Sequence, residues 1–445
     1  MNDPSELSAA RQLAGLAGLH QDEVPDDVLL VASQCLLDGL GVGVGGAEEP
    51  AVTRLLSVLS SGDVATIIGG GRVSSMYDAA LVNGTAMHAL DFDDVSAPML
   101  GHPTAPVLPA LLALGERLDS TLVELRLALV AGIEAEVRLA VALGTSHYAV
   151  GFHTTATTGA VGAAVACAQL LGLDGETAAR AVSTAATQAA GLKASFGTDC
   201  KPLHAGRAAQ TGLLSTLLAA EGFTAAEDAI GGRQGLAATQ STSWDAARLR
   251  PTDPATWYTR DIAFKVHAAC YLTHGSIEGV LALTDPNTRA DRIELHVPTG
   301  HLKACAIEDP GTGLEGKFSL RYVAALTAVR RRVTEDLFDP AAMHDPQVRS
   351  VMERVTVVPH DDMSNFLTRV VATTDGVPKT ITVDMQQRRW QASPAEQWDR
   401  LADKFRGLAA PVIGAERADR VMGFICHDPS GVSVRQLLTW VRRPG

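Results

Sequence analysis

Residues 156–172 read ATTGAVGAAVACAQLLG, and this run of small apolar residues indicates the fold class. The run is long enough for several helical turns, and alanine is the strongest helix former. Its Ala- and Gly-rich composition, together with Gln169 inside it, predicts a buried helix that packs closely and not a membrane span. A helix that is apolar on all sides needs other helices around it, so the run predicts a helical core.

The same Ala- and Leu-rich composition extends over residues 1–265, broken by Gly or by short polar turns such as Leu173-Asp174-Gly175. Strand-like alternation of apolar and polar residues is nearly absent there. This part of the chain therefore predicts a series of helices, over residues 5–16, 27–40, 104–118, 120–143, 157–171, 175–190 and 206–221.

The pattern changes near residue 290, where apolar and polar residues begin to alternate. Alternation predicts strands over 292–297, 354–358, 368–373 and 380–383. Thr374-Asp375-Gly376 is a hairpin-type turn signal between the last two of them. Helical stretches are expected at 315–332 and 345–352, and Pro394 opens further helices that run to the C-terminus.

This layout predicts a mostly α fold, with a large all-helical domain that is completed by the C-terminus and a smaller inserted α+β domain. The helical domain takes residues 1–265 and returns over 394–445, and the α+β domain takes 266–393. The length of 445 residues fits two domains, and 46% apolar residues supply ample material for a core.

The charge balance argues against nucleic-acid binding, because 37 Lys and Arg against 50 Asp and Glu give a net charge of -13 without a basic run. An acidic protein that binds an anion must concentrate its positive groups locally. The six cysteines are scattered without C-x-x-C spacing, which favours reduced thiols and a cytoplasmic location. Met1–Glu6 is polar and acidic, and does not resemble a signal peptide.

Asn83–Pro109 (NGTAMHALDFDDVSAPMLGHPTAPVLP) crowds Asp91, Asp93 and Asp94 between His88 and His102. One interpretation is a solvated acidic turn, because aspartates commonly form turns. Another is that an aspartate orients a histidine as an acid/base pair. A divalent metal is a less favoured alternative, since the segment lacks the Gly and Glu of a calcium loop.

Residues 151–155 (GFHTT) stand at the start of the apolar helix quoted above. A helix N-terminus attracts anions, so a substrate carboxylate is expected to dock beside His153 and Thr154. The structural alternative is that His153 only caps the helix.

Residues 197–207 (GTDCKPLHAGR) place Lys201, His204 and Arg207 close together in an otherwise acidic chain. Such a local positive site suits carboxylate recognition, although a solvated basic turn has the same composition.

Two further segments carry polar residues, and several common motifs are missing. His267 and His274 in KVHAACYLTH (265–274) lie seven residues apart, on one face if the segment is helical. The usual explanation for such a pair is structural, with buried histidines that hydrogen-bond to the backbone. GLEGKFSLRY (313–322) opens a helix of the α+β domain.

There is no dinucleotide fingerprint, P-loop, nucleophile elbow or His-Glu-x-x-His pattern.

Taken together, these segments resemble the MmgE/PrpD family, which includes 2-methylcitrate dehydratase, cis-aconitate decarboxylase and iminodisuccinate epimerase. The likeness runs over nearly the whole chain. It is carried by HALDFDD (88–94), GHP (101–103), GFHTT (151–155), KPLHAGRAAQTGLL (201–214), TH (273–274) and KFSLRY (317–322).

The resemblance implies that the α+β domain is a lid and that the active site lies between it and the helical domain. It also implies a homodimer, no cofactor and no metal. The catalytic set that it implies is Asp91, His102, His153, Lys201, His274 and Tyr322. The residues expected to bind a small polycarboxylate substrate are Lys201, His204, Arg207, Thr154 and Lys317.

All three family chemistries transfer a proton at a carbon next to a carboxylate. We expect His102, oriented by Asp91, and His153 to move this proton. Val95 follows DFDD where decarboxylases of the family carry threonine, which favours dehydration of a 2-methylcitrate-like acid. The alternatives are decarboxylation of a cis-aconitate-like acid, epimerisation of an iminodisuccinate-like acid, and a carboxylate-binding homologue without catalysis.

Overall fold

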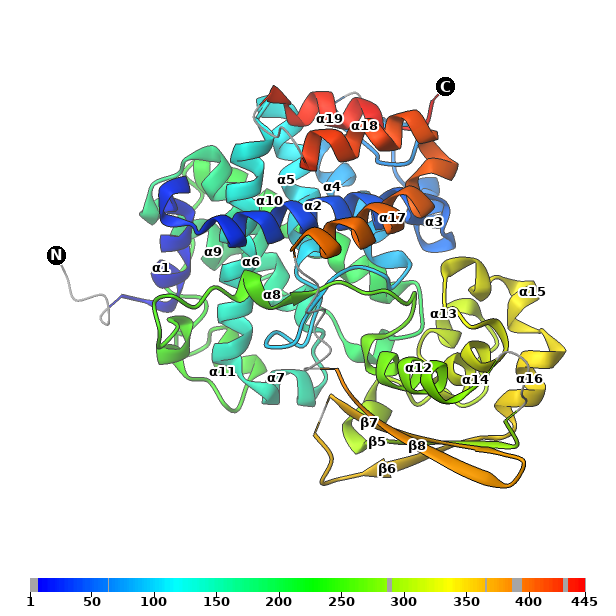
Figure 1. Ribbon diagram of the computed structural model, residues 1–445. Helices are drawn as coiled ribbons and strands as arrows, with labels where there is room; N and C mark the ends of the chain where they lie inside the picture. Colours follow the sequence, from blue (N-terminus) through cyan, green and yellow to red (C-terminus); the bar gives the residue numbers. More distant parts are fainter. Residues whose placement is uncertain are drawn as a thin grey trace.

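The computed structural model describes residues 7–62, 64–285, 290–364, 366–385, 394–426 and 431–444. Helices dominate these residues and the strands form small sheets, which confirms the mostly α fold with an α+β part. Figure 1 shows the helices α1–α11 and α17–α19 in one body, beside a second that holds α12–α16 and a four-stranded sheet. We call these the helical body and the sheet body.

The N-terminal helices include all the predicted ones and four others, α3, α4, α7 and α11, whose ranges were not predicted. Their bounds are α1 (Ala9–Ala14), α2 (Asp26–Gly45), α3 (Pro50–Val58), α4 (Met76–Ala89), α5 (Thr104–Leu118), α6 (Leu122–Leu143), α7 (Thr145–Val150), α8 (Thr154–Leu171), α9 (Gly175–Ala186), α10 (Cys200–Ala220) and α11 (Leu236–Gln240). The run that opened the sequence analysis forms α8, which is buried from Thr154 to Ala168. The helix predicted from residue 206 begins earlier, at Cys200, and α1 is shorter than predicted because Ser8 caps it.

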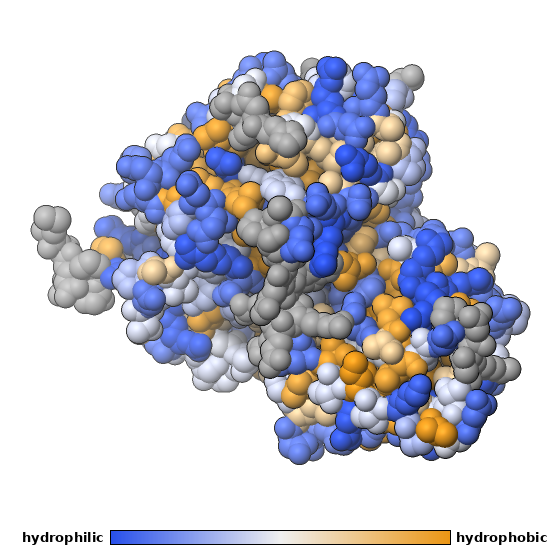
Figure 2. Space-filling view, in the orientation of Figure 1, coloured by the Kyte–Doolittle hydropathy of each residue, from blue (hydrophilic) through white to orange (hydrophobic). Residues whose placement is uncertain are grey.

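Two helical stretches, Asp26–Glu48 and Thr154–Leu171, are long and apolar enough to cross a membrane. However, 83% of each is buried inside the protein, as in the core helix of a folded domain. Figure 2 shows that one face of the molecule is mostly hydrophilic, with apolar side chains gathered over the sheet body.

Close approach of α4 and α10 depends on two glycines that face each other. A Cβ on Gly84 would lie 2.7 Å from the Gly206 Cα atom, and a Cβ on Gly206 would lie 2.1 Å from the Leu81 carbonyl oxygen. The two backbones therefore touch. This contact brings the N-terminal end of α10 beside the C-terminal end of α4.

The sheet body holds the sheet β6-β5-β7-β8, in which β5 and β6 are parallel and the other pairs antiparallel. Its elements are α12 (Tyr271–Leu283), β5 (Arg292–Pro298), α13 (Gly313–Gly316), α14 (Leu320–Arg330), α15 (Pro340–Met343), α16 (Pro346–Met352), β6 (Val355–His360), β7 (Leu367–Thr374) and β8 (Val377–Asp384). The predicted hairpin turn is confirmed, since Asp375 and Gly376 have φ of 52° and 74°.

The chain returns to the helical body through α17 (Pro394–Ile413), α18 (Ala415–Cys426) and α19 (Val434–Val441). Helix α17 packs along α2, and α19 packs on α5 (Figure 1). Two strand pairs were not predicted, because each strand is two residues long: β1 (Ala65–Thr66) with β2 (Val73–Ser74), and β3 (Val95–Ser96) with β4 (Ile262–Ala263).

Candidate active site

A cavity of about 420 Å³ lies between the helical body and the sheet body. Asp91, His102 and Lys201 line it from the helical side, and Cys270 and Phe318 line it from the sheet side. A larger cavity of about 580 Å³ is lined by Lys265, Glu335 and Lys404, among others. We place the candidate site in the smaller cavity, because that is where buried titratable groups converge.

Asp91 is the centre of the cluster. Its Oδ1 atom accepts a hydrogen bond from the Lys201 ammonium, and its Oδ2 atom lies 3.0 Å from the Lys265 ammonium. Lys265 also donates to the Asp91 carbonyl oxygen at 2.6 Å. Burial alone would raise the pKa of Asp91, but the two ammonium groups outweigh it and the pKa is lowered. Asp91 is therefore ionised.

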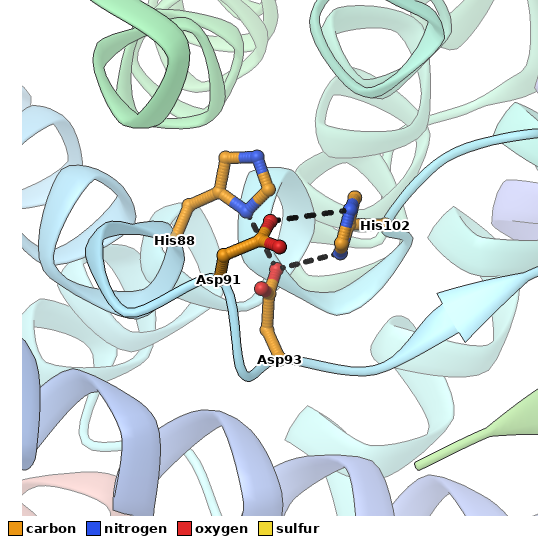
Figure 3. A group of neighbouring side chains, drawn as sticks. All are labelled: His88, Asp91, Asp93 and His102. Atoms are coloured by element: carbon orange, nitrogen blue, oxygen red, sulfur yellow. Dashed lines mark hydrogen bonds and ion pairs between the residues drawn. The ribbon is translucent and has the colours of Figure 1, made fainter. Parts of the chain in front are cut away.

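Asp93 lies between two histidine rings, as Figure 3 shows. Its Oδ2 atom is 2.8 Å from His88 Nδ1 and 3.2 Å from His102 Nδ1. His102 Nε2 is 4.0 Å from Asp91 Oδ1, so Asp93 is the nearer carboxylate to His102, whereas Asp91 was predicted to orient this ring. Burial would raise the pKa of Asp93, but the two histidines lower it overall.

The two histidines differ in their access to the cavity. The His88 side chain is fully buried, and its Nε2 atom lies 3.0 Å from Lys201 Nζ. Burial lowers its pKa to about 3, so its ring is neutral. The His102 side chain is 13% exposed, and burial lowers its pKa as well. Its Nδ1 atom lies 3.2 Å from Asp93 Oδ2, and a proton on Nδ1 would leave the Nε2 lone pair for a general base.

His153 adds a third ring. It stands before the first turn of α8, but its side chain makes no capping bond, and its Nδ1 atom lies 3.1 Å from His204 Nδ1. It also stacks on His88, with the ring centroids 5.7 Å apart. Burial is the main reason that the pKa of His153 lies well below its usual range.

The loop after α4 holds these groups through tight backbone geometry. Asp91 and Leu100 have φ of 50° and 55°, which few residues other than glycine adopt. A Cβ on Gly101 would lie 3.1 Å from Thr155 Oγ1, the atom that accepts a hydrogen bond from the His102 backbone N–H. The pair β3–β4 ties this loop to the chain segment that leads to Lys265.

The mouth of the cavity is positively charged. Lys303 is exposed and lines the cavity, and Lys193 lies over the Tyr148 ring at 3.6 Å from its centroid. Burial lowers the pKa of Lys193, and the charge of Lys303 lowers it further. The cavity wall therefore carries two cations, the buried Lys201 and the exposed Lys303.

His88, Asp91, Asp93 and His102 offer ligand atoms within 4.8 Å of one another, a spacing that suits a metal ion. However, both Asp91 oxygens and one His88 nitrogen already contact ammonium groups. The positive charge that a metal would supply is present in Lys201 and Lys265, and it would repel a divalent ion. The absence of a metal remains a prediction.

Of the predicted catalytic residues, the structure brings four together at the cavity wall: Asp91, His102, His153 and Lys201. His204, predicted to bind substrate, reaches the group through its contact with His153.

Three residues predicted to bind substrate do not line the cavity. Arg207 is exposed and hydrogen-bonds to Gln210 on the same helix. Lys317 is buried and donates to the Leu90 carbonyl oxygen, so it holds the backbone directly before Asp91. Thr154 is buried in the first turn of α8 and does not line the cavity.

The two catalytic residues predicted in the sheet body are also outside the cavity wall. His274 is buried, with Nε2 3.1 Å from the His267 carbonyl oxygen, and the two rings pack at 5.1 Å. Tyr322 is buried and its hydroxyl donates to the Leu337 and Ala342 carbonyls. Their positions support a structural role, and a direct catalytic role is not supported by the geometry.

The sequence analysis did not select Lys265, the second ammonium on Asp91. Its apolar neighbours, Phe264 and Val266, could have indicated that Lys265 is buried. A buried lysine needs a partner of opposite charge, so it would have been a candidate for the site. Cys270 and Lys303 were missed as well, since neither belongs to a recognisable motif and only the folded chain brings them to the cavity.

Comparison with known proteins agrees with this geometry. Residues 11–248 match the family model of the MmgE/PrpD N-terminal domain, and residues 267–423 match that of the MmgE/PrpD C-terminal domain. The chain is 29% identical to a cis-aconitate decarboxylase of Mus musculus over 434 residues, covering 91% of this chain and 88% of that protein. It is 27% identical to a cis-aconitate decarboxylase-like protein of Aspergillus oryzae, with 95% of each chain covered. It is 26% identical to a cis-aconitate decarboxylase of Aspergillus terreus, with 91% and 90% covered.

Proposed function

Because this chain belongs to the MmgE/PrpD family, as its motifs predicted, we propose that it is a lyase that removes carbon dioxide from a small tricarboxylate similar to cis-aconitate. The relatives named above carry that activity in their names, and the family includes dehydration as well. The observation that supports the proposal most is the group of Asp91, His102 and Lys201 at the cavity wall, with Asp93 and Lys265 in contact with it from behind.

The charges favour a polycarboxylate substrate. The two carboxylates of Asp91 and Asp93 balance the two ammonium groups of Lys201 and Lys265. The net charge of this cluster is therefore zero as long as the His102 ring is unprotonated. Lys303, an exposed residue of the cavity wall, can bind a carboxylate of the substrate. An anion that enters favours the protonated form of His102, so the substrate binds together with a proton.

The proposed chemistry needs a proton donor and a place for negative charge. When the bond to the departing carboxylate breaks, its electron pair spreads into the conjugated system and the remaining carboxylates. Lys201 stabilises that charge, and His102 delivers its proton to carbon. Phe196 and Phe318 form apolar walls beside Lys201, and an apolar wall solvates the departing carboxylate poorly, which promotes its loss.

A second candidate is dehydration of a 2-methylcitrate-like acid, which the sequence analysis placed first. Val95 lines the cavity and offers no hydroxyl to a substrate carboxylate. The loss of a hydrogen bond to a charged group costs roughly 1.5–3 kcal/mol, enough to change how a substrate is held. We rank decarboxylation above it because the relatives compared are decarboxylases.

The test is to incubate the protein with cis-aconitate and with 2-methylcitrate, and to follow loss of CO2 or of water by mass spectrometry. We expect CO2 from cis-aconitate, unchanged by exhaustive chelation. Water loss from 2-methylcitrate alone would establish the second candidate. Deuterium entering recovered substrate in D2O without either loss would indicate epimerisation, and tight binding without turnover would indicate a binding protein.

We further propose a homodimer, as the family resemblance implies, in the cytoplasm, which the scattered cysteines favour. Light scattering of the purified protein measures the oligomeric state, and a mass of one chain would contradict the dimer. Fractionation of the native cell tests the location.

A further inference from the structure

The larger cavity, of about 580 Å³, is lined from both bodies of the molecule. Helix α17 contributes residues from the helical body, and the segment 332–336 contributes residues from the sheet body. This cavity shares no lining residue with the candidate active site. Its volume lies in the range of pockets that hold small organic ligands. We call it the α17 cavity.

Two chain segments form a thin wall between the α17 cavity and the candidate active site. Asp91 lines the active-site cavity, and the next residue, Phe92, lines the α17 cavity. Ala263 and Phe264 are divided between the two cavities in the same way. Lys265 lines the α17 cavity and donates to the Asp91 carbonyl oxygen at 2.6 Å. A ligand in the α17 cavity would therefore contact the segments that hold the Asp91 carboxylate.

Three cations in the wall of the α17 cavity already have partners within the protein. Lys404 Nζ lies 2.6 Å from Asp38 Oδ1 and donates to two backbone carbonyl oxygens. Lys265 is held in the ion pair described above. At the rim, the exposed Arg332 pairs with the exposed Asp336 at 2.9 Å. Because these cations are engaged, they do not favour an anionic ligand.

Two acceptor oxygens in the same wall lack a donor. Oε1 of Glu335 and Oε1 of Gln397 are buried, and neither accepts a hydrogen bond from the described residues. Glu335 belongs to the sheet body and Gln397 to α17, so each body contributes one of them. Burial raises the pKa of Glu335, although the charge of Lys317 opposes this. Buried acceptors without donors are rare in folded proteins, so the wall favours a ligand that supplies donors.

The remaining wall of the α17 cavity is largely apolar. Phe92, Phe264, Leu401 and Leu408 all line it. Apolar side chains of this kind gain free energy when they bury a hydrocarbon group of a ligand. A carboxylate beside them, such as that of Glu335, forms a charge-assisted hydrogen bond with an ammonium group. Together these groups suit an organic cation that carries N–H donors at one end and hydrocarbon at the other.

We propose that the α17 cavity is a second ligand site, which binds a small organic ammonium ion such as a primary amine with a hydrocarbon chain. The ammonium group donates to Glu335 and Gln397, and the hydrocarbon packs on Phe264 and Leu401. Such a ligand joins the two bodies at α17. The site does not depend on which polycarboxylate the other cavity takes.

The experiment titrates the full-length protein with hexylamine and measures the heat of binding. We expect one site with a Kd of about 1 mM or lower, the affinity that a ligand of this size can reach. Hexanol and hexanoate have the same chain without the ammonium group, and each should bind roughly 10-fold more weakly or not at all.

Variants locate the site. Glu335→Gln and Gln397→Leu should each weaken hexylamine binding by roughly 10-fold, the effect of losing a hydrogen bond to a charged group. Glu353→Gln is the matched control, because Glu353 is an exposed carboxylate of the sheet body that lines neither cavity. It should bind hexylamine as the parent does. Hydrogen exchange should show the peptides around Phe92 and Phe264 protected by hexylamine in the parent but not in Glu335→Gln.

Equal affinity of the parent and Glu335→Gln for hexylamine would overturn the proposal. So would hexanol that binds as tightly as hexylamine, or a parent protein that binds no hexylamine in the millimolar range. None of these measurements needs a substrate. A protein that binds hexylamine in the α17 cavity but consumes no cis-aconitate would therefore support this proposal and contradict only the proposed function.

Discussion

At the scale of single residues, Asp91 combines an uncommon backbone conformation with two buried ion pairs. Its φ of 50° is one that aspartate tolerates better than most side chains. Removing one partner from a buried ion pair typically costs roughly 3–5 kcal/mol, because the other charge is left without compensation. The Lys201 side chain is 2% exposed, so replacing Lys201 is expected to disturb folding as well as chemistry.

His102 provides a cleaner test of catalysis, because its side chain faces the cavity. In His102→Asn, the amide keeps a donor for Asp93 but has no group that takes up a proton at the Nε2 position. We expect kcat/KM to fall by roughly 10²-fold or more, the scale of a lost general acid/base, with little change in Tm. Steady-state kinetics and thermal unfolding measure both.

The contrast is His88, which contacts Asp93 and Lys201 and is fully buried. His88→Asn is expected to lower the free energy of unfolding by roughly 1–3 kcal/mol, since it leaves a buried polar group without a partner. Near-normal kcat/KM in His102→Asn would show that His102 is not the acid/base group.

Asp94 carries a prediction about pH. Burial, and then the charge of Asp38, raise its pKa to about 7 from a usual 3.8. Between pH values of about 4 and 7, the Asp94 carboxyl is protonated in the folded protein and ionised in the unfolded chain. The free energy of unfolding therefore falls as the pH rises through this range. Asp94→Asn resembles the protonated acid beside Thr104 and should make this decline shallower. Urea unfolding across this range tests it, and parallel pH profiles for the two proteins would contradict it.

At the scale of elements, the contact between α4 and α10 sets the distance between Lys201 and the Asp91 loop. In Gly206→Ala, the added Cβ meets the Leu81 carbonyl oxygen at 2.1 Å, a backbone atom that cannot turn away. We expect a loss of roughly 1–3 kcal/mol in the free energy of unfolding, the usual cost of overpacking, and a fall in kcat/KM as Lys201 moves. Denaturant unfolding and kinetics measure these.

Gly423→Ala in α18 is the matched control, because nothing lies within 4 Å of its added Cβ. It should stabilise the protein by roughly 0.4–1 kcal/mol through the unfolded chain, without an effect on kcat/KM. If both variants behaved alike, the close approach of α4 and α10 would not govern the site.

Element boundaries followed from the sequence where the signal is local. The predicted helix 104–118 is α5, and Asp375-Gly376 forms the predicted turn because few residues tolerate positive φ at both positions. The strand pair β3–β4 could not be predicted, since two residues are too short for alternation and their partners lie far apart in the chain.

Prediction of the site met the same limit. Asp91, His102, His153 and Lys201 come from segments with recognisable motifs, and packing brings them to one wall. Arg207 and Tyr322 lie in equally recognisable segments, but each projects from a helix face that points away from the cavity. Which face of a helix meets the cavity depends on its neighbours, and the sequence of that helix does not contain this information.

At the scale of the whole molecule, Lys404 of α17 joins segments that are far apart in the chain. Its Nζ atom lies 2.6 Å from Asp38 Oδ1 of α2, and donates to the carbonyl oxygens of Phe92 at 2.6 Å and Lys265 at 3.2 Å. The C-terminal return thus holds both ends of the Asp91 cluster. This contact links the last helices to the site, although none of their described side chains lines the cavity.

Lys404→Met tests this link. The side chain of Lys404 is 9% exposed and that of Asp38 is 1% exposed, so the variant leaves a buried carboxylate without its cation. We expect the free energy of unfolding to fall by roughly 3–5 kcal/mol at pH 8. Burial raises the pKa of Asp38, so that carboxyl takes up a proton more easily at pH 5 and the loss should be smaller there. The activity should fall too, since Phe92 and Lys265 lose an anchor.

The double variant Asp38→Asn/Lys404→Met removes both charges and should recover much of the stability but not the activity. Equal losses at both pH values, or a double variant less stable than Lys404→Met, would mean that Lys404 stabilises the molecule through its carbonyl contacts and not through the charge of Asp38.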